Sequence, residues 1–209
     1  MSTQSLQVAA VPIPSKLSLR RLGRLYLGLA LFGASVGLMI SSGLGVDPWD
    51  VFHQGLARQV GLSIGTVVIG VSVIVLLLWI PLRQRPGLGT LSNALLVGLA
   101  VDASLLALPT PGEIVPRASF LVIGIVLNGV ATGLYIGAAL GPGPRDGLMT
   151  GLAQRGHSVR GARTAIEVTM LAAGWILGGT VGVGTVLYAL SIGPLAQIFI
   201  ARFTIADPA

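Results

Sequence analysis

Six long apolar runs, separated by short polar segments, restrict the possible folds of this chain more than any other feature. Extended by a few flanking residues, most of these runs reach the ~20 residues that a membrane-spanning helix needs. None of them alternates apolar and polar residues with a period of two, as the strands of a membrane barrel do. The sequence therefore predicts an all-α polytopic membrane protein with six transmembrane helices, at residues 25–40, 64–82, 91–108, 120–140, 165–177 and 186–200.

The composition agrees with a chain that lies in lipid. Only 10% of the 209 residues are charged, whereas a soluble domain carries about 25% charged residues. The chain has no cysteine and only two histidines, so we predict no disulfide, no metal site and no cofactor. A net charge of +6 also occurs in nucleic-acid-binding proteins, but here the basic residues flank apolar runs. The predicted partner is therefore the lipid bilayer and not nucleic acid.

The basic residues also predict the orientation of the chain. Residues 1–24 are polar, contain two prolines and end in a basic cluster, which predicts a disordered basic cytoplasmic tail. A cleavable signal peptide is the alternative, but the apolar run after Arg24 is too long for one. With both termini in the cytoplasm, 11 of the 13 Lys and Arg residues lie inside, and only Arg58 and Arg117 lie outside. This bias predicts a multi-pass protein with both termini cytoplasmic.

An internal repeat divides the membrane domain into two halves. Residues 22–57 align without a gap on residues 118–153, with 14 identities in 36 positions, and a shift of 95 continues the match further along. Each half, 25–108 and 118–203, holds three predicted spans, so the second half inserts upside down relative to the first. Inverted repeats of this kind recur in secondary transporters. The alternative is that the duplication only builds a symmetric scaffold.

Each half contains a short segment, rich in glycine and proline, that interrupts the apolar pattern. Both segments start a new helix with a capping residue, a proline in the first helical position and an aspartate in the third. These short helices either re-enter the protein, with their positive N-termini inside, or lie at the membrane surface as amphipathic connectors. The aspartates in the third helical position, Asp50 and Asp146, either bind the substrate or only cap the free N–H groups of their helices. We predict the substrate-binding site here, at Asp47, Pro48, Trp49 and Asp50 in the first half and at Gly143, Pro144, Arg145 and Asp146 in the second.

Four strings in and beside these segments resemble one group of bacterial membrane proteins. They are Gly45-Val46-Asp47-Pro48-Trp49-Asp50, Pro86-Gly87-Leu88-Gly89-Thr90, Gly141-Pro142-Gly143-Pro144-Arg145-Asp146-Gly147-Leu148 and Gly178-Gly179-Thr180-Val181-Gly182-Val183-Gly184-Thr185. The likeness, from about Leu25 to Ile200, is to the YczE/YyaS group, which is distantly similar to the YitT group. The resemblance implies a polytopic protein of the bacterial inner membrane. It implies no catalytic residue and no particular substrate.

Three further ionisable residues lie within the predicted spans. Charges at such depth cost roughly 2.5–3.5 kcal/mol each on insertion scales, so they usually face a partner or a cavity. Asp102 has no charged neighbour in sequence, whereas Arg163 and Glu167 lie four residues apart and can meet on one helix face. All three are candidate substrate ligands. The alternatives are a partner on another helix for Asp102 and a local ion pair near the cytoplasmic end for the other two.

These features favour a small secondary transporter or permease, which moves a small polar or zwitterionic solute through a site between the two inverted repeats. The only lysine is Lys16, in the tail, so the chain has no Walker-type loop. The alternatives are the substrate-capture membrane subunit of a multi-component importer and a non-catalytic membrane scaffold that supports secondary-metabolite production. His53 and His157 lie in connectors on opposite sides of the membrane, and we predict no enzyme activity. Stripes of small residues permit close packing within the chain, and they also permit a homodimer.

Overall fold

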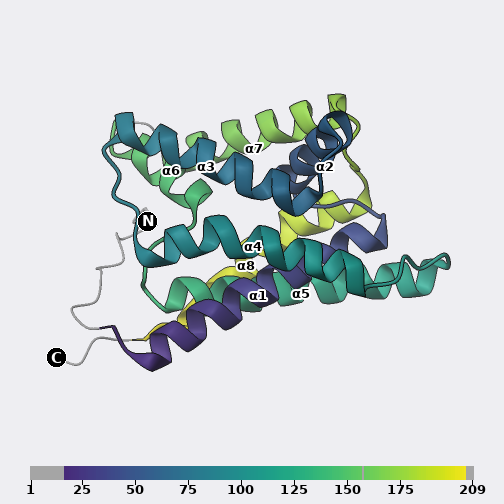
Figure 1. Cartoon of the computed structure of the whole chain (residues 1–209), viewed down its shortest axis with the longest axis horizontal. Coiled ribbons are helices and arrows are strands. Elements are labelled where there is room, and N and C mark those ends of the chain that lie inside the picture. Colours follow the sequence, from purple (N-terminus) through teal and green to yellow (C-terminus); the bar gives the residue numbers. More distant parts are fainter. Residues whose placement is uncertain (1–16, 157, 206–209) are drawn as a thin grey trace, which may run out of the picture.

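The computed structural model describes residues 17–156 and 158–205, and within them the secondary structure is helical (Figure 1). The all-α prediction is therefore confirmed for this part of the chain. Two of its helices, α2 and α6, are short, and each follows a long one. The helices are α1 (Leu19–Ser42), α2 (Pro48–Val60), α3 (Ile64–Leu82), α4 (Leu88–Ala107), α5 (Ile114–Gly137), α6 (Pro144–Ala153), α7 (Val159–Ile176) and α8 (Val183–Phe203).

Five helices are long and apolar enough to cross a membrane, namely α1, α3, α4, α5 and α8. The predicted span at 64–82 coincides with α3. The sixth predicted span, at 165–177, falls in α7, which begins earlier and is not one of the five. The difference has a physical reason, because Arg160, Arg163 and Glu167 all lie in the first half of α7.

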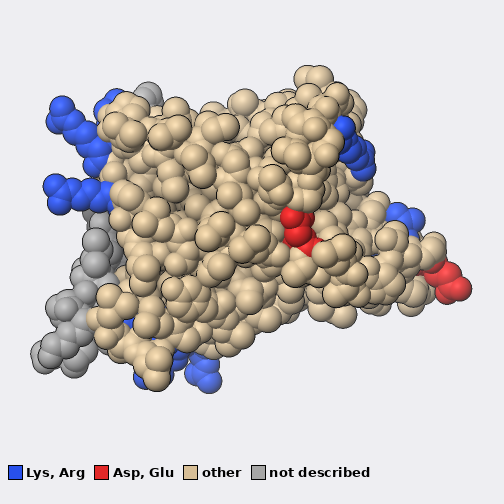
Figure 2. All heavy atoms as spheres, in the orientation of Figure 1, with Lys and Arg blue, Asp and Glu red and all other residues tan. Residues whose placement is uncertain are grey.

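The outer surface of the bundle carries the apolar side chains that a lipid-facing surface requires. The large side chains of Ile80, Leu106 and Leu190 are 71%, 90% and 71% exposed. On the face shown in Figure 2, Arg side chains lie at the two ends, and the surface between them is uncharged apart from acidic atoms near its centre. Charges at both ends of a broad apolar band are typical of a membrane-embedded helix bundle.

The first helix begins before the predicted end of the tail. Residues 19–24 belong to α1, so they are helical and not part of a disordered tail. The buried side chain of Arg21 donates to the carbonyl oxygen of Ala138, just after α5, at 3.0 Å, and Arg24 donates to a carbonyl at the end of α8. Carbonyl groups at helix C-terminal ends lack N–H donors within their own helix, so the guanidinium groups of these arginines supply the missing donors. The predicted tail at 1–16 lies outside the described residues.

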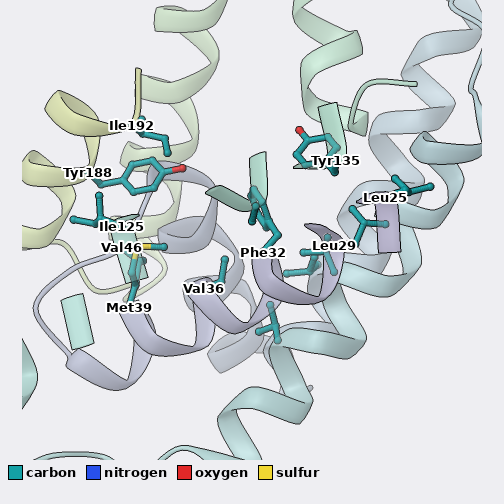
Figure 3. Close-up of a cluster of buried hydrophobic side chains, with 14 of the residues drawn as sticks. Leu25, Leu29, Phe32, Val36, Met39, Val46, Ile125, Tyr135, Tyr188 and Ile192 are labelled. Atoms are coloured by element: carbon teal, nitrogen blue, oxygen red, sulfur yellow. The ribbon is translucent and has the colours of Figure 1, made fainter. Parts of the chain in front are cut away.

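The helices α1 and α5 make the most extensive helix–helix packing among the described helices, and both contribute to the main hydrophobic core. α1 also packs against α4 and α5 against α8, while the short helix α2 packs against α7 and α6 against α3. A Cβ atom at Gly28 of α1 would lie 2.8 Å from the backbone nitrogen of Tyr135 of α5, so only glycine permits this crossing. Figure 3 shows the side chains on the core face of α1, which are Leu25, Leu29, Phe32, Val36 and Met39.

Residues related by the internal repeat make matching contacts in the fold. The backbone N–H of Gly89 donates to the carbonyl oxygen of Leu140 at 2.7 Å, and that of Gly184 donates to Leu44 at 2.8 Å. Each bond joins the start of a long helix, α4 or α8, to the loop that precedes a short one. The start of α4 and the start of α8 lie at opposite ends of the bundle (Figure 1). The two glycine- and proline-rich segments are therefore fixed in the same way at opposite ends.

Candidate functional site

The N-terminal ends of the two short helices meet inside the bundle. Asp47 caps α2, because its Oδ1 atom accepts the backbone N–H of Asp50 at 2.8 Å, and Pro48 occupies the first helical position. Pro144 occupies the corresponding position of α6. The second carboxylate oxygen of Asp47 lies 3.3 Å from Nη1 of Arg145, in the first turn of α6. An ion pair thus joins the two predicted parts of the site, which are far apart in sequence.

Both short helices run from the interior toward the surface. In α2, the side chains of Trp49 and Asp50 are 4% and 5% exposed, whereas Val60 at the other end is 51% exposed. Likewise α6 begins at the buried Pro144 and ends beside the exposed Gln154. The N-terminal ends of both helices therefore point into the protein, as in the re-entrant placement.

A cavity of about 50 Å³ lies where these helix starts meet. Valines of α1, α3 and α4 form its apolar wall. Its polar wall also includes side chains that the sequence did not select as site residues, namely Ser72, Asn93, Tyr135 and His53. For Ser72, Asn93 and Tyr135 the signal in the sequence is a polar residue inside an apolar run, and such residues more often hold helices together than bind ligands. For His53 the signal is its position one turn after Asp50. Six predicted site residues line the cavity, which are Trp49, Asp50, Gly143, Pro144, Arg145 and Asp146.

Two of the polar contacts at the cavity fix its carboxylates in place. Oδ2 of Asp146 accepts the hydroxyl group of Tyr135 at 2.7 Å. On the opposite short helix, Nδ1 of His53 lies 3.1 Å from Oδ1 of Asp50, one turn apart. Each aspartate in the third helical position therefore has its own partner, and the two partners differ chemically.

Two buried polar atoms at the cavity have no hydrogen-bond partner within the described structure. They are Oδ2 of Asp50 and the indole Nε1 of Trp49. A buried polar group without a partner costs about 1–3 kcal/mol, so such atoms at a cavity point to a molecule that pairs with them. The first is an acceptor and the second is a donor. The cavity therefore offers both kinds of hydrogen bond to a small polar molecule.

The charged groups around the cavity are unequal in number. Three carboxylates, of Asp47, Asp50 and Asp146, lie close to one guanidinium group, that of Arg145, so their formal charges sum to −2 when the nearby imidazole is neutral. The guanidinium carbon also lies 5.3 Å from the centroid of the Phe32 ring, in a cation–π contact. Removing charges of one sign from water is costly unless opposite charges pair with them. These surroundings favour positive groups over anions.

Five predicted site residues do not line the cavity: Asp47 and Pro48, which start α2 beside it, and Asp102, Arg163 and Glu167, which have other contacts. Asp102 of α4 caps the start of α3, because its Oδ1 accepts the N–H of Gly65 at 2.7 Å and its Oδ2 accepts the hydroxyl group of Ser63 at 2.6 Å. Arg163 and Glu167 form an exposed ion pair along α7 with a separation of 2.9 Å. Asp102 therefore has a partner on another helix, and Arg163 and Glu167 form a local ion pair. These are the contacts that the sequence analysis gave as the alternatives to a role as substrate ligands.

Comparison with known proteins identifies relatives of this chain. A family model described as "Family of unknown function (DUF6198)" matches residues 19–201. The chain is 43% identical over 177 residues to an "Uncharacterized protein" of Haemophilus influenzae, which covers 84% of this chain and 81% of the relative. It is 36% identical over 172 residues to the "Uncharacterized membrane protein YczE" of Bacillus subtilis, which covers 80% of both chains.

A third relative is the "Uncharacterized protein YyaS" of Bacillus subtilis, with 29% identity over 180 residues, which are 83% of this chain and 89% of the relative. No solved structure matches the chain. The predicted resemblance to the YczE/YyaS group is therefore confirmed. Together with the five apolar helices, these matches show that the chain is a membrane protein and that it belongs to the DUF6198 family.

Proposed function

We propose that this protein is a small secondary transporter or permease of the bacterial inner membrane, which moves a small polar or zwitterionic solute through the cavity between α2 and α6. One observation carries the proposal: broken segments from both halves of the chain build a single cavity that contains unpaired polar atoms. Broken helices whose N-terminal ends face a shared internal site are typical of secondary transporters.

The proposed architecture consists of two inverted repeats of three spans each, with one short broken helix in each repeat. Matching contacts of residues related by the repeat support it. Arg117 donates to the carbonyl oxygen of Ser42 at the end of α1 at 2.7 Å, just as Arg21 donates to that of Ala138 after α5. In both halves, an arginine at the start of one long helix thus binds the carbonyl end of the other.

The sixth span of this architecture is α7, and with it both termini lie in the cytoplasm. Arg160 and Arg163 lie in the first two turns of α7, from where their long side chains can reach the membrane surface. Figure 1 shows α7 extending in the same general direction as the other long helices. The start of α1 and the end of α8 also lie together, since Arg24 donates to the carbonyl oxygen of Phe203. This contact supports an even number of spans.

Alternating access requires contacts on both sides of the cavity that can open and close. A Cβ atom at Gly45 would lie 2.7 Å from the backbone nitrogen of Gly182, and one at Gly141 would lie 3.1 Å from Cα of Gly87. Gly45 and Gly141 also have φ angles of 111° and 118°, which other residues rarely adopt. These two glycine contacts, at opposite ends of the bundle, act as the gates of the proposed transporter.

Single cysteines can test whether the cavity lies on a hydrated path, because the chain has no cysteine of its own. Ser72 lines the cavity from α3, whereas Thr169 is exposed on the outside of α7. In membrane vesicles, Ser72→Cys is expected to react with a small water-soluble thiol reagent. Thr169→Cys is the matched control and is expected to stay unreacted, because a thiol that faces lipid does not form the reactive thiolate.

Solute flux is the second measurement. Proteoliposomes that contain the wild-type protein are expected to take up small polar solutes down a gradient, without ATP, faster than protein-free liposomes. No flux, together with no labelling of Ser72→Cys from either side, would contradict the proposal. Labelling of Thr169→Cys would place α7 outside the lipid and remove the sixth span. Stoichiometric copurification with an ATPase would identify a substrate-capture subunit instead, and copurification with a synthase would identify a scaffold.

A further inference from the structure

Building on the proposed function, we propose that the transported solute is a compact organic cation. It carries an ammonium group that pairs with Oδ2 of Asp50 and, next to it, a hydrogen-bond acceptor that pairs with the indole N–H of Trp49. The proposal narrows the class of small polar solutes to those in which a cationic donor and a neutral acceptor are separated by a short link.

The cation follows from the geometry of Asp50. Its side chain is buried, and His53 holds one of its carboxylate oxygens at 3.1 Å, which fixes the orientation of the group. The second oxygen has no partner in the described part of the chain, although the residue lines the cavity. A carboxylate oxygen only accepts hydrogen bonds, and its strongest bonds are those with a charged donor. An ammonium group provides such a donor.

The acceptor follows from a comparison of two tryptophans. Nε1 of Trp79 donates to the carbonyl oxygen of Pro144 at 3.0 Å, so this buried indole is satisfied within the protein. Nε1 of Trp49 is buried at the cavity and has no such partner among the described residues. An indole N–H is a donor only. A hydroxyl or carbonyl oxygen on the solute would therefore complete the hydrogen bonding of Trp49.

Charge and size limit the solute further. Among the described residues that line the cavity, Arg145 alone carries a guanidinium group, and it is already paired with Asp47, while Asp146 is paired with Tyr135. An anionic solute would have to displace Asp47 from Arg145, whereas a cation would reduce the excess of negative charge. About 50 Å³ holds roughly three to five water-sized groups. The solute is therefore small, with few non-hydrogen atoms.

Four small probes separate these features in an equilibrium binding experiment at neutral pH. Ethanolamine has the cation and the acceptor, ethylamine has only the cation, ethylene glycol has only neutral hydroxyl groups, and acetate is an anion. Isothermal titration calorimetry of the purified protein is expected to show the tightest binding for ethanolamine, weaker binding for ethylamine and none for acetate. Ethanolamine is also expected to protect Ser72→Cys from thiol labelling, while acetate is not.

Matched variants assign each part of the solute to its residue. Asp50→Asn is expected to weaken ethanolamine binding at least tenfold, and Asp146→Asn is expected to weaken it less, because the hydroxyl group of Tyr135 already occupies that carboxylate. Trp49→Phe keeps an aromatic ring but removes the N–H, so it is expected to abolish the preference for ethanolamine over ethylamine. Glu167→Gln, in the exposed pair on α7, is the control and is expected to bind like wild type.

Several results would overturn the inference. Acetate that binds as tightly as ethylamine, ethanolamine that binds no better than ethylene glycol, or unchanged binding by a folded Asp50→Asn protein would each do so. If the variants do not fold, the protection of Ser72→Cys, measured with Asp50 and Trp49 intact, still decides between cation and anion. Flux of neutral or anionic solutes without amine binding would refute this inference and leave the proposed transport intact. Binding of the amines without any flux would refute the proposed transport but would leave the proposed cation-binding site intact.

Discussion

The ion pair between Asp47 and Arg145 links the two short helices, so removal of either charge is expected to destabilise the fold. The side chain of Asp47 is 1% exposed and that of Arg145 is 27% exposed. Breaking a fully buried pair costs about 3–5 kcal/mol, whereas an exposed pair is worth at most about 1 kcal/mol. With one partner buried and the other partly exposed, Asp47→Asn is expected to lower the free energy of unfolding by about 2–4 kcal/mol.

The choice of asparagine separates the ion pair from the helix cap. The amide oxygen of Asn can still accept the N–H of Asp50, as Oδ1 of Asp47 does at 2.8 Å. Asp47→Ala removes this cap as well and is expected to cost about 1 kcal/mol more than Asp47→Asn. In the double variant Asp47→Asn/Arg145→Gln, no unpaired guanidinium remains. Its cost is therefore expected to fall below the sum of the single costs by about 0.5–3 kcal/mol.

Unfolding of the purified proteins in mixed micelles with increasing SDS, followed by tryptophan fluorescence, measures these free energies. The matched control is the exposed pair on α7, where Arg163→Gln and Glu167→Gln are each expected to change the free energy of unfolding by no more than about 0.5 kcal/mol. If Asp47→Asn cost as little as these controls, or if the costs in the double variant were additive, the contact would not link the short helices and the reasoning would be refuted.

Three further predictions concern packing, the cap of α3 and topology. Gly147→Ala is expected to lower the melting temperature, because the added Cβ atom would lie 2.0 Å from the Trp79 ring. Gly70→Ala is the control and is expected to have little effect, because the space around Gly70 is open. Equal melting temperatures of the two variants would contradict the close packing at Gly147. Asp102→Asn is expected to lower the free energy of unfolding, measured by SDS unfolding, by about 1–3 kcal/mol, because the carboxylate of Asp102 caps the start of α3. Its binding of ethanolamine is expected to be unchanged. A folded variant with lost binding would place Asp102 at the site. A reporter fused after Ala209 is expected to be active in the cytoplasm, and periplasmic activity would contradict the inverted repeat.

The features that the sequence predicted best have local causes. Proline lacks an N–H group and has a fixed φ angle, so Pro48 and Pro144 determine where α2 and α6 begin within a few residues. The apolar run at 64–82 likewise determines the whole of α3. For the starts of α2 and α6 and for the extent of α3, the local sequence alone was sufficient to predict the helix boundaries.

Contacts between distant residues could not be predicted in this way. The side chains of Asp47 and Arg145 meet although 98 residues separate them, and only the packing of both short helices brings them together. For Asp102, the sequence indicates depth within a span but not the direction of the side chain, which turns toward Ser63 at the start of α3. The basic cluster before residue 25 looked like a tail, because its acceptors lie more than 100 residues further along, at Ala138 for Arg21.

Some residues that the two halves share lie at the turns that lead into the short helices. The residues that the halves share include Gly45 and Gly141, whose positive φ angles turn the chain into the short helices in both halves. Such positions build the framework, and a substitution in one half alone would break a contact that the other half retains. These shared residues therefore explain the similar path of the chain into both short helices, and they do not determine which solute the proposed site would bind.

The differences between the halves lie at the cavity wall. The position of Trp49 in the first repeat is that of Arg145 in the second, and the equivalent aspartates have different partners, an imidazole for Asp50 and a phenol for Asp146. The carboxylate of Asp146 is bound within the second half and Arg145 is paired with Asp47 of the first, while α2 carries an acceptor and a donor that have no partner among the described residues. The proposed solute, with an ammonium group and a hydrogen-bond acceptor, would therefore bind in one orientation. Both polar groups would face α2, and the apolar part of the solute would face the valines of α3.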